Sequence, residues 1–442
     1  MDSFLLIAYL VLVFLAFVQA FTVGVQTWEH RRYVRSCLRG LTKHRPRGRA
    51  AVFAPCKGID VDLEDNLRAL LRQDYDDYEV TFIVESADDP ACPTIRRIMA
   101  EHPSVATRLI VAGKATSTGQ KIHNLRAATA DLSPEVSYLA FIDSDAHPRP
   151  DWLRIIVSRL SRGTLGAVTG YRWFVPKRST FVNHLLYSLN SNVMALLGHN
   201  SHYLIWGGSW GLRRDVFDSI ELHEAWDGAL TEDLVAGCQL RQAGLRVRFE
   251  PACVVASPMD YSPREMWSFM RRQYLLGRLY TFDWWMLALA STTLGNLGWI
   301  VNTIALVMSL AFGSVPLWLP LVVYAMLYYP PIYRGVVRQS LIRTYFPDQE
   351  RALRSARRFD IVAGPIVGLV NWLGVIGSLF GYRVTWRGIS YLVSPTGKVR
   401  SVRHQHDPDA ESNPPEPAVA HSVSIDNTET YVEEPTSLRK AG

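Results

Sequence analysis

Hydrophobic residues form long runs near both ends of this chain and short runs across its middle. Between about residues 50 and 258 the short runs alternate with amphipathic segments. Short apolar runs favour strands, and apolar residues spaced three and four apart favour helices. The expected strands are residues 50–54, 80–84, 109–111, 138–142 and 166–170, and the expected helices are residues 63–72 and 94–101. This alternation predicts an α/β domain whose mostly parallel sheet is covered on both faces.

The first apolar run, residues 4–25, is long enough to cross a bilayer, which needs about 20 such residues. A cleaved signal peptide is the alternative, but signal peptides carry a basic start, and this chain has Asp2 and no cation there. The run is followed by Arg31, Arg32, Arg35 and Arg39. Cations beside a span mark its cytosolic side, so we expect a retained anchor followed by a cytosolic domain.

Apolar segments return after residue 261. Residues 284–312 and 317–329 are separated only by residues 313–316, which predicts a hairpin of spanning helices. Residues 361–380 are interrupted by Pro365 and several glycines and have arginines on both sides, which favours a re-entrant or interfacial element over a full crossing. Residues 261–280 are amphipathic, as in helices that lie in the headgroup plane.

These patterns divide the chain into six segments. They are a transmembrane anchor (1–27), a soluble domain (28–260), an interfacial amphipathic helix (261–282), a membrane region (283–382), a cytosolic segment (383–403) and a disordered tail (404–442). The tail is rich in Pro, Ser, Glu and Asp and has few apolar residues, a composition typical of disorder.

Charge and cysteine content narrow the classes of function. The net charge of +6 comes with no nucleic-acid-binding motif, so we assign the excess to arginines beside the apolar spans. The five cysteines are odd in number and form no CxxC pair. They are expected to be free thiols in a reducing compartment.

Three acidic clusters stand where the predicted strands end or a helix begins: residues 85–90, Asp143 with Asp145, and residues 231–233. Ligands of parallel sheets bind beyond the carboxyl ends of the strands. Sugar transfer from a nucleoside diphosphate needs carboxylates to hold the nucleoside, to hold a divalent cation and to deprotonate the attacking hydroxyl. Ligand sets made of oxygen atoms suit Mg²⁺ or Mn²⁺.

Each cluster also has a purely structural explanation. Asp143 and Asp145 could form an Asx-rich turn, and Asp88 with Asp89 could precede a helix that starts at a proline. Glu232 and Asp233 could complement a helix N-terminus. The order of all three clusters in one alternating domain between membrane anchors favours the catalytic interpretation.

The chain resembles the family 2 glycosyltransferases with a GT-A fold and, within them, the ceramide glucosyltransferase group. The matching stretches are PCKGID (55–60), DDPA (88–91), KIHNL (121–125), FIDSD (141–145), TED (231–233) and WRGISY (386–391). The resemblance extends over nearly the whole chain except the tail. It implies a Rossmann-like GT-A glycosyltransferase domain over residues 28–260, with one N-terminal and two to three C-terminal membrane helices.

The resemblance also implies roles for individual residues. Asp88 or its neighbours are expected near the uridine, Asp143 and Asp145 at the diphosphate and metal, and Asp233 as the general base. The family's (Q/R)xxRW motif corresponds here to residues 269–274, where the Trp is missing. The expected donor-site residues are Pro55, Glu85, Asp88, Lys121, Asn124, Asp143, Arg271, Arg272 and Tyr274.

The resulting hypothesis is an inverting hexosyltransferase that moves a hexose, expected to be glucose, from a UDP-sugar to the hydroxyl of a membrane lipid such as ceramide. It needs Mg²⁺ or Mn²⁺ and no nucleic acid. The catalytic domain is expected in the cytosol, at a bacterial inner membrane rather than the Golgi or ER. The alternatives are a processive polysaccharide synthase, which needs more spans and an intact QxxRW, and a non-catalytic nucleotide-sugar sensor, which has no need of three acidic clusters.

Overall fold

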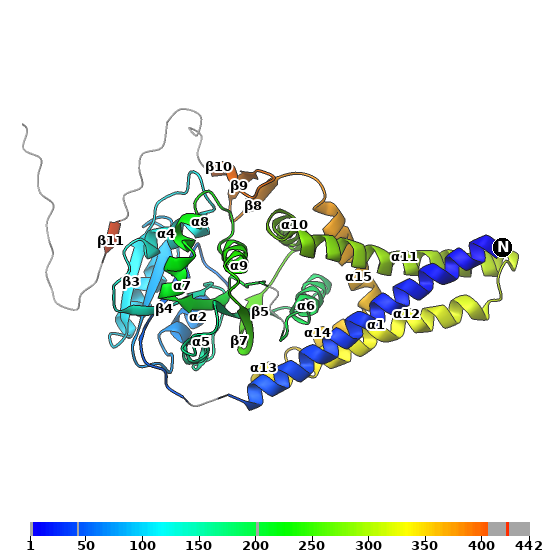
Figure 1. The fold of residues 1–442 in the computed structure, drawn as a ribbon, viewed down its shortest axis with the longest axis horizontal. Coiled ribbons are helices and arrows are strands. Elements are labelled where there is room, and N and C mark those ends of the chain that lie inside the picture. The colour runs from blue at the N-terminus through cyan, green and yellow to red at the C-terminus, as the bar shows by residue number, and fades with distance from the viewer. Residues whose placement is uncertain (1–2, 42–43, 200–202, 405–420, 424–442) are drawn as a thin grey trace, which may run out of the picture.

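A mixed β-sheet lies at the centre of the wide end of the molecule (Figure 1). The structure is a computed structural model and describes residues 3–41, 44–199, 203–404 and 421–423. The strands of this sheet are β1 Arg49–Pro55, β2 Tyr78–Val84, β3 Ala106–Val111, β4 Val136–Ile142, β5 Ala167–Pro176, β6 Ser209–Arg213, β7 Val247–Met259 and β11 His421–Val423.

The spatial order of the strands is β11-β3-β2-β1-β4-β6-β5-β7. β1 is parallel to β2 and β4, β2 to β3, and β5 to β7, whereas β6 is antiparallel to both of its neighbours and β11 to β3. All five expected strands are present, and the predicted α/β class with a mostly parallel sheet is confirmed. β6 and β7 were not predicted, because β6 is short and contains a glycine and the apolar pattern of β7 is broken by Arg248 and Glu250.

Both faces of the sheet are covered by helices. In β1, Ala50, Val52 and Ala54 pack into one core while Ala51 and Phe53 pack into another, so successive residues face opposite sides. The first core includes α2 Leu63–Leu70, α3 Cys92–Glu101 and α5 Trp152–Leu160. The second includes α4 Gln120–Thr129, α7 Arg214–Ser219, α8 Leu222–Ala225 and α9 Glu232–Gln242. Burial of both faces explains why the strands read as unbroken apolar runs.

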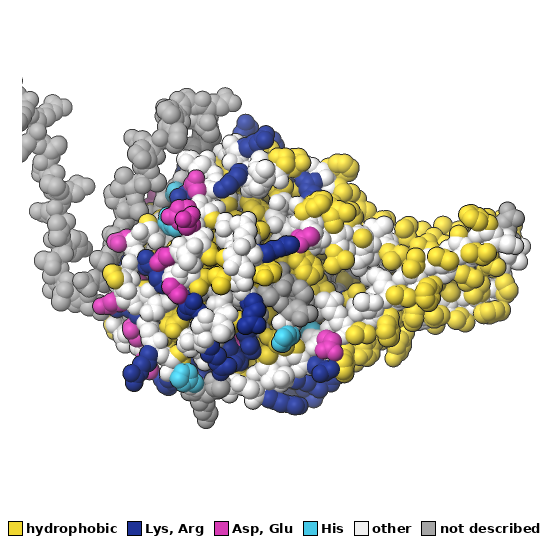
Figure 2. Space-filling view, viewed as in Figure 1, with side chains coloured by type: hydrophobic (Ala, Val, Ile, Leu, Met, Phe, Trp, Pro, Cys, Tyr) yellow, Lys and Arg dark blue, Asp and Glu magenta, His cyan; other side chains and the backbone are white. Residues whose placement is uncertain are grey.

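Three long helices form the narrow extension of the molecule: α1 Ser3–Arg39, α11 Phe282–Phe312 and α12 Trp318–Gln339 (Figure 1). Hydrophobic side chains cover its visible surface, whereas charged side chains gather on the wide end (Figure 2). Gly298 of α11 lies against α1, since a Cβ at Gly298 would come within 2.6 Å of the Ala16 Cβ. Small residues allow such close helix packing in membranes.

The length and composition of α1 and α11 each suffice for a membrane span. A third candidate is the pair α14 Arg354–Val362 and α15 Gly364–Gly377, which is bent by 82°. α11 and α12 form the predicted hairpin, but of the two only α11 is a candidate span, and the last two turns of α12 carry Arg334 and Arg338. The chain therefore has two to three candidate membrane helices.

The remaining elements lie outside the central sheet and the three long helices. They are α6 Phe181–Met194, α10 Pro263–Tyr280, α13 Ile342–Tyr345, η1 Pro347–Gln349 and a second, antiparallel sheet of β8 Arg383–Trp386, β9 Ile389–Val393 and β10 Val399–His404. α10 occupies the predicted amphipathic segment and begins with a capping box between Ser262 and Glu265. The second sheet was not predicted, because residues 383–403 were expected only as a cytosolic segment.

The predicted disordered tail lies outside the described residues, except for His404 at the end of β10 and the three residues of β11. All five cysteines are free, as expected.

A buried ion pair joins α12 to α14. Arg338 Nη2 lies 2.9 Å from Asp360 Oδ1, and these two residues are 4% and 2% exposed. Asp360 also accepts hydrogen bonds from Gln339 Nε2 at 2.6 Å and from Ser191 Oγ of α6 at 3.3 Å. One carboxylate therefore fixes α6, α12 and α14 relative to one another.

Asp360→Ala should lower the free energy of unfolding by about 3–5 kcal/mol, because it leaves the Arg338 guanidinium buried without its counter-ion. Thermal unfolding of the detergent-purified protein measures this as a fall of several degrees in Tm. Asp348→Ala removes an exposed carboxylate of η1 and should leave Tm unchanged. Equal Tm values for both variants would contradict the structural role of Asp360.

Candidate active site

A cavity of about 640 Å³ lies between the central sheet, the helices α6, α10 and α11, and the second sheet. The α/β domain contributes polar side chains that include Lys121, Asp143, Asp145, Arg172, Glu232 and Asp233. α6 and α11 contribute apolar ones that include Leu186, Leu189, Val193, Trp284, Trp285 and Ala288. A charged group of residues and an apolar one therefore share a single cavity.

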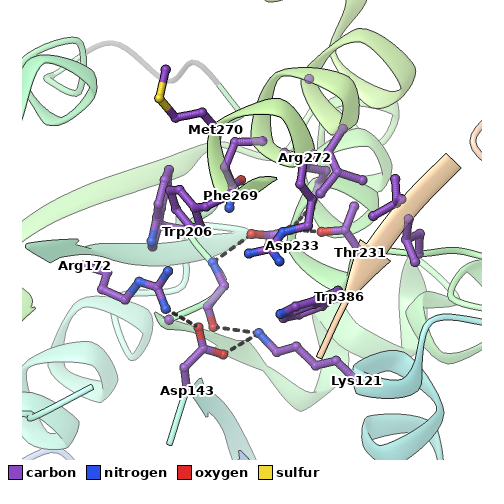
Figure 3. Close-up of a pocket in the computed structure, with 18 of the residues that line it drawn as sticks. Lys121, Asp143, Arg172, Trp206, Thr231, Asp233, Phe269, Met270, Arg272 and Trp386 are labelled. Atoms are coloured by element: carbon purple, nitrogen blue, oxygen red, sulfur yellow. Dashed lines mark hydrogen bonds and ion pairs between the residues drawn. The ribbon is translucent and has the colours of Figure 1, made fainter. Parts of the chain in front are cut away.

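Lys121 joins two carboxylates of the charged group, and its contact with Asp143 is drawn in Figure 3. Its Nζ lies 2.5 Å from Asp143 Oδ1 and 2.5 Å from Glu232 Oε1. Lys121 stands in the first turn of α4, Asp143 directly follows β4, and Glu232 is the first residue of α9. Three elements distant in sequence thus meet at one ammonium group.

The protonation states follow from burial and charge. Burial lowers the pKa of Lys121, but the carboxylates of Asp143, Glu232 and Asp233 outweigh it and hold this pKa above its usual value. For Asp143, burial raises the pKa, but Lys121 and Arg172 reverse this, so the net shift is downward. Burial raises the pKa of Glu232 to about 7, even though Lys121 opposes the shift. Lys121 and Asp143 are therefore charged near neutral pH, and Glu232 titrates there.

Arg172 of β5 holds the second aspartate of the FIDSD stretch. Its Nη1 lies 2.8 Å and 3.0 Å from the two carboxylate oxygens of Asp145, and 3.5 Å from Asp143 Oδ2. Sequence reasoning missed Arg172. The sequence feature that could have identified Arg172 is that it is the only charged residue in the largely apolar residues 167–176.

Asp233 is held by donors on both of its oxygens. Oδ2 accepts from the backbone N–H of Gly207 at 2.8 Å, and Oδ1 accepts from the N–H of Leu234 at 2.7 Å and from the Thr231 hydroxyl. A Cβ at position 207 would lie 2.4 Å from Glu232 Oε1 and 2.9 Å from Asp233 Oδ2. Only glycine fits here without moving the carboxylates, which explains one of the two adjacent glycines in residues 206–211, WGGSWG.

Most of the expected site residues line this cavity. They are Pro55, Lys121, Asn124, Asp143, Asp145, Asp233, Arg272 and Tyr274. Within the described part of the chain, Glu85, Asp88 and Arg271 are not among the lining residues. Lys57, which does line it, pairs with Glu85.

The sequence analysis expected Asp88 to share a cleft with the other carboxylates. Among the described residues, Asp88 is not part of the lining of this cavity. Asp88 is exposed, and its neighbour Asp89 accepts from the N–H of Gly58 at 2.9 Å and of Ala91 at 2.9 Å. Asp89 thus binds backbone N–H groups before α3, and a role of Asp88 at the donor stays a prediction.

Arg271 is not among the residues that line the cavity, and its guanidinium contacts backbone groups. It donates to the backbone carbonyls of Gly377, Phe380 and Arg383 at 3.2–3.3 Å and so fixes the chain that follows α15. Arg272, the next residue, lies over the ring of Trp386 at 4.8 Å from its centroid. Of the two arginines, only Arg272 lines the cavity.

Asp143 and Asp145 could hold a divalent cation only together with ligands from outside the protein. Among the described residues no third carboxylate, histidine or cysteine joins them in a metal-binding group. Their oxygens instead contact Lys121 and Arg172. Mg²⁺ commonly uses one or two carboxylates, with waters and substrate phosphates completing its shell. The pair therefore fits a cation that arrives with a diphosphate.

The family model of glycosyl transferase family 21 matches residues 11–399, which is most of the chain. The chain belongs to this glycosyltransferase family. This confirms the resemblance to the ceramide glucosyltransferase group, with the family numbered 21 and not 2. The mixed sheet with its apolar N-terminal and C-terminal helices agrees with the GT-A fold that the resemblance implied.

Two curated relatives of this family 21 enzyme come from Caenorhabditis elegans. Ceramide glucosyltransferase 1 is 24% identical over 120 residues, covering 27% of this chain and 25% of the relative. Ceramide glucosyltransferase 3 is 28% identical over 78 residues, covering 18% and 17%. The matched segments thus span a quarter or less of these relatives.

Among solved structures, a mannosyltransferase from Pyrobaculum calidifontis in complex with GDP-Man and Mn²⁺ matches with a TM-score of 0.48 and 16% identity. The match covers 82% of this chain and 99% of that chain.

Glu232 should make the stability of this glycosyltransferase pH-dependent. Its folded pKa of about 7 exceeds its usual value of 4.5, so the folded state binds the proton more tightly than the unfolded chain. The resulting stabilisation is full below about pH 4.5 and is lost as the pH rises through about 7, a change of roughly 1–3 kcal/mol. Glu232→Gln should therefore flatten the fall in Tm between about pH 5 and about pH 8.

Glu224→Gln, at an exposed carboxylate of α8, is the matched control and should keep the wild-type slope. An unchanged slope in Glu232→Gln would show that burial does not raise this pKa.

Proposed function

We propose that this family 21 glycosyltransferase transfers a hexose, with glucose as the first candidate, from a UDP-sugar to the hydroxyl of a membrane lipid such as ceramide. The observation that carries the proposal is the shared cavity, in which Asp233 and the Lys121–Asp143 pair lie together with apolar residues of α6 and α11. Nucleotide-sugar donors are typical of glycosyltransferases with this fold.

The apolar lining supports a lipid acceptor. Trp284, Trp285 and Ala288 belong to α11, which is long and apolar enough to span a membrane. A lipid whose chains remain against α6 and α11 can present its hydroxyl to the carboxylates without leaving the bilayer. Arginines in the last turns of α1 support a cytosolic position for the catalytic domain.

In the proposed reaction the lipid hydroxyl oxygen attacks the anomeric carbon of the hexose, and the bond from that carbon to the diphosphate oxygen breaks. Asp233 takes the hydroxyl proton, and UDP leaves with the bonding electrons. Attack opposite the leaving group inverts the anomeric centre and gives a β-linked product. The three donors that hold Asp233 keep its carboxylate oriented for the proton transfer.

Charge develops on the departing diphosphate, and Lys121 and Arg172 stand next to the aspartates that would face it. Asp143 and Asp145 would hold Mg²⁺ or Mn²⁺, which when bound offsets the negative charge of the diphosphate. Both cationic side chains fix the aspartate geometry and add to the positive field around the leaving group.

Asp233→Asn should lower kcat by about 10²–10⁴-fold, because an amide cannot accept the hydroxyl proton. Turnover is measured with purified enzyme in detergent, radiolabelled UDP-glucose and ceramide, followed by thin-layer separation of the products. UDP binding, measured by calorimetry, should persist in this variant.

Asp218→Asn, at an exposed carboxylate of α7, is the control and should keep full activity. Wild-type turnover in Asp233→Asn would exclude Asp233 as the base. A panel of other UDP-hexoses and lipid alcohols run in parallel tests the identity of both substrates.

Asp143→Ala should weaken UDP binding in the presence of Mg²⁺ by about 10-fold or more, since a charged ligand of the cation is lost. EDTA should abolish wild-type turnover, and added Mg²⁺ or Mn²⁺ should restore it. Asp131→Ala, exposed after α4, is the control. Turnover that survives chelation would refute the metal-dependent part of the proposal.

A further inference from the structure

The β8–β9 hairpin, which the chain forms after its last apolar helix, contributes side chains to the cavity wall. Trp386 is paired with Ile389, so the loop between the strands consists of Arg387 and Gly388 alone. Both residues have positive φ, 47° and 76°. Two left-handed residues in a two-residue loop define a type I′ turn, in which Asn–Gly and Asp–Gly are preferred.

Arginine is therefore an unfavourable residue for the first position of this turn. A side chain with a Cβ is strained in the left-handed region, where asparagine and glycine are tolerated. Strained residues of this kind persist where the surrounding structure over-determines them, and they cluster at ligand-binding sites. The geometry of the hairpin alone gives no reason for a guanidinium here.

The guanidinium of Arg387 is held by the loop that follows β1. Its Nη2 lies 2.6 Å from Asp60 Oδ1, and its Nη1 donates to the Lys57 carbonyl. The other oxygen of Asp60 accepts from Ser144 Oγ at 2.6 Å, and Ser144 stands between Asp143 and Asp145. Arg387 is thus connected through Asp60 to the loop with the two expected metal ligands.

Arg387 also lines the same cavity as Lys121, Asp143 and Asp145. Burial lowers its pKa, but the carboxylates of Asp60, Asp145 and Asp143 outweigh this and raise it, so the group is always charged. The side chain is still 33% exposed, which leaves room for a second partner.

Neighbouring residues of the hairpin contact the helices on both sides of the charged group. Trp386 lies against Arg272 of α10, and the Tyr391 hydroxyl accepts from the backbone N–H of Gln120, the residue before Lys121. The tip of the hairpin is therefore positioned relative to α4, α10 and the loop after β4 at once.

We propose that Arg387 is a donor-binding residue whose guanidinium exchanges the carboxylate of Asp60 for the diphosphate of the nucleotide sugar. This inference rests on the proposed function of the same cavity. The planar fork of an arginine binds phosphate oxygens in a bidentate manner, and a diphosphate carries more charge than one carboxylate. Asp60 then serves to hold the guanidinium in place before the donor arrives.

The test compares wild-type enzyme with Arg387→Asn, which keeps the turn because Asn–Gly is a preferred type I′ pair. Dissociation constants are measured by calorimetry for UDP, uridine and inorganic pyrophosphate in the presence of Mg²⁺. We expect the Kd of UDP and of pyrophosphate to rise by about 10-fold to 100-fold, because a charge-assisted hydrogen-bonding partner is lost. The Kd of uridine, which has no phosphate, should not change.

Arg383→Asn, at an exposed position on the same β8 strand, is the matched control and should bind all three ligands as the wild type does. Asp60→Asn separates ligand binding from a merely structural role. Freed from its carboxylate, Arg387 should bind UDP as tightly as before or more tightly. A structural role predicts that Asp60→Asn and Arg387→Asn weaken UDP binding alike, and that result would overturn the inference.

Unchanged Kd values for UDP and pyrophosphate in Arg387→Asn would also overturn it. Failure of the proposed function gives a different result. In that case wild-type enzyme would neither bind UDP nor turn over a UDP-sugar, while pyrophosphate binding would still depend on Arg387.

Discussion

The compensation of buried charge around Lys121 is the constraint on which the rest of this site depends. Asp143 and Glu232 could not approach each other as carboxylates in a largely buried position without the ammonium group between them. Through this group the loop after β4, the start of α4 and the start of α9 take fixed positions. The backbone of Gly207 then comes close enough to hold Asp233.

The same arrangement decides where chemistry can occur. The charges of the α/β domain lie at one cavity with apolar side chains of α6 and α11, and the Arg338–Asp360 pair fixes α6 against α12 and α14. In the proposed reaction a polar donor from the aqueous phase and an apolar acceptor from the bilayer meet in this cavity. In the proposed reaction this geometry replaces the extraction of a lipid from its bilayer.

The α/β domain does not form the cavity alone. Trp386, Arg387 and Tyr391 enter its wall from the second sheet, more than 140 residues after Asp233 in sequence. The chain thus crosses the region of the long helices before it returns to complete the site. The position of the long helices therefore affects the geometry of the site proposed to bind the nucleotide sugar.

The sequence by itself determined the features that depend on local pattern. Short apolar runs located five strands, long runs located α1 and α11, and the positions of Asp143, Asp145 and Asp233 after a strand or at a helix start marked them as one site. Strand period, span length and the geometry of strand ends are properties of neighbouring residues. These features can therefore be predicted from the sequence without knowledge of the tertiary structure.

Only the tertiary structure decided which charged residues share the cavity. Arg172, Glu232 and Arg387 join the site because partners distant in sequence compensate their charge, whereas Asp88 is exposed and Arg271 binds backbone carbonyls elsewhere. The second sheet likewise exists through packing against α10 and not through a strong local pattern. Burial of charge is a long-range property, because its cost is offset only by groups that the fold brings within a few ångströms.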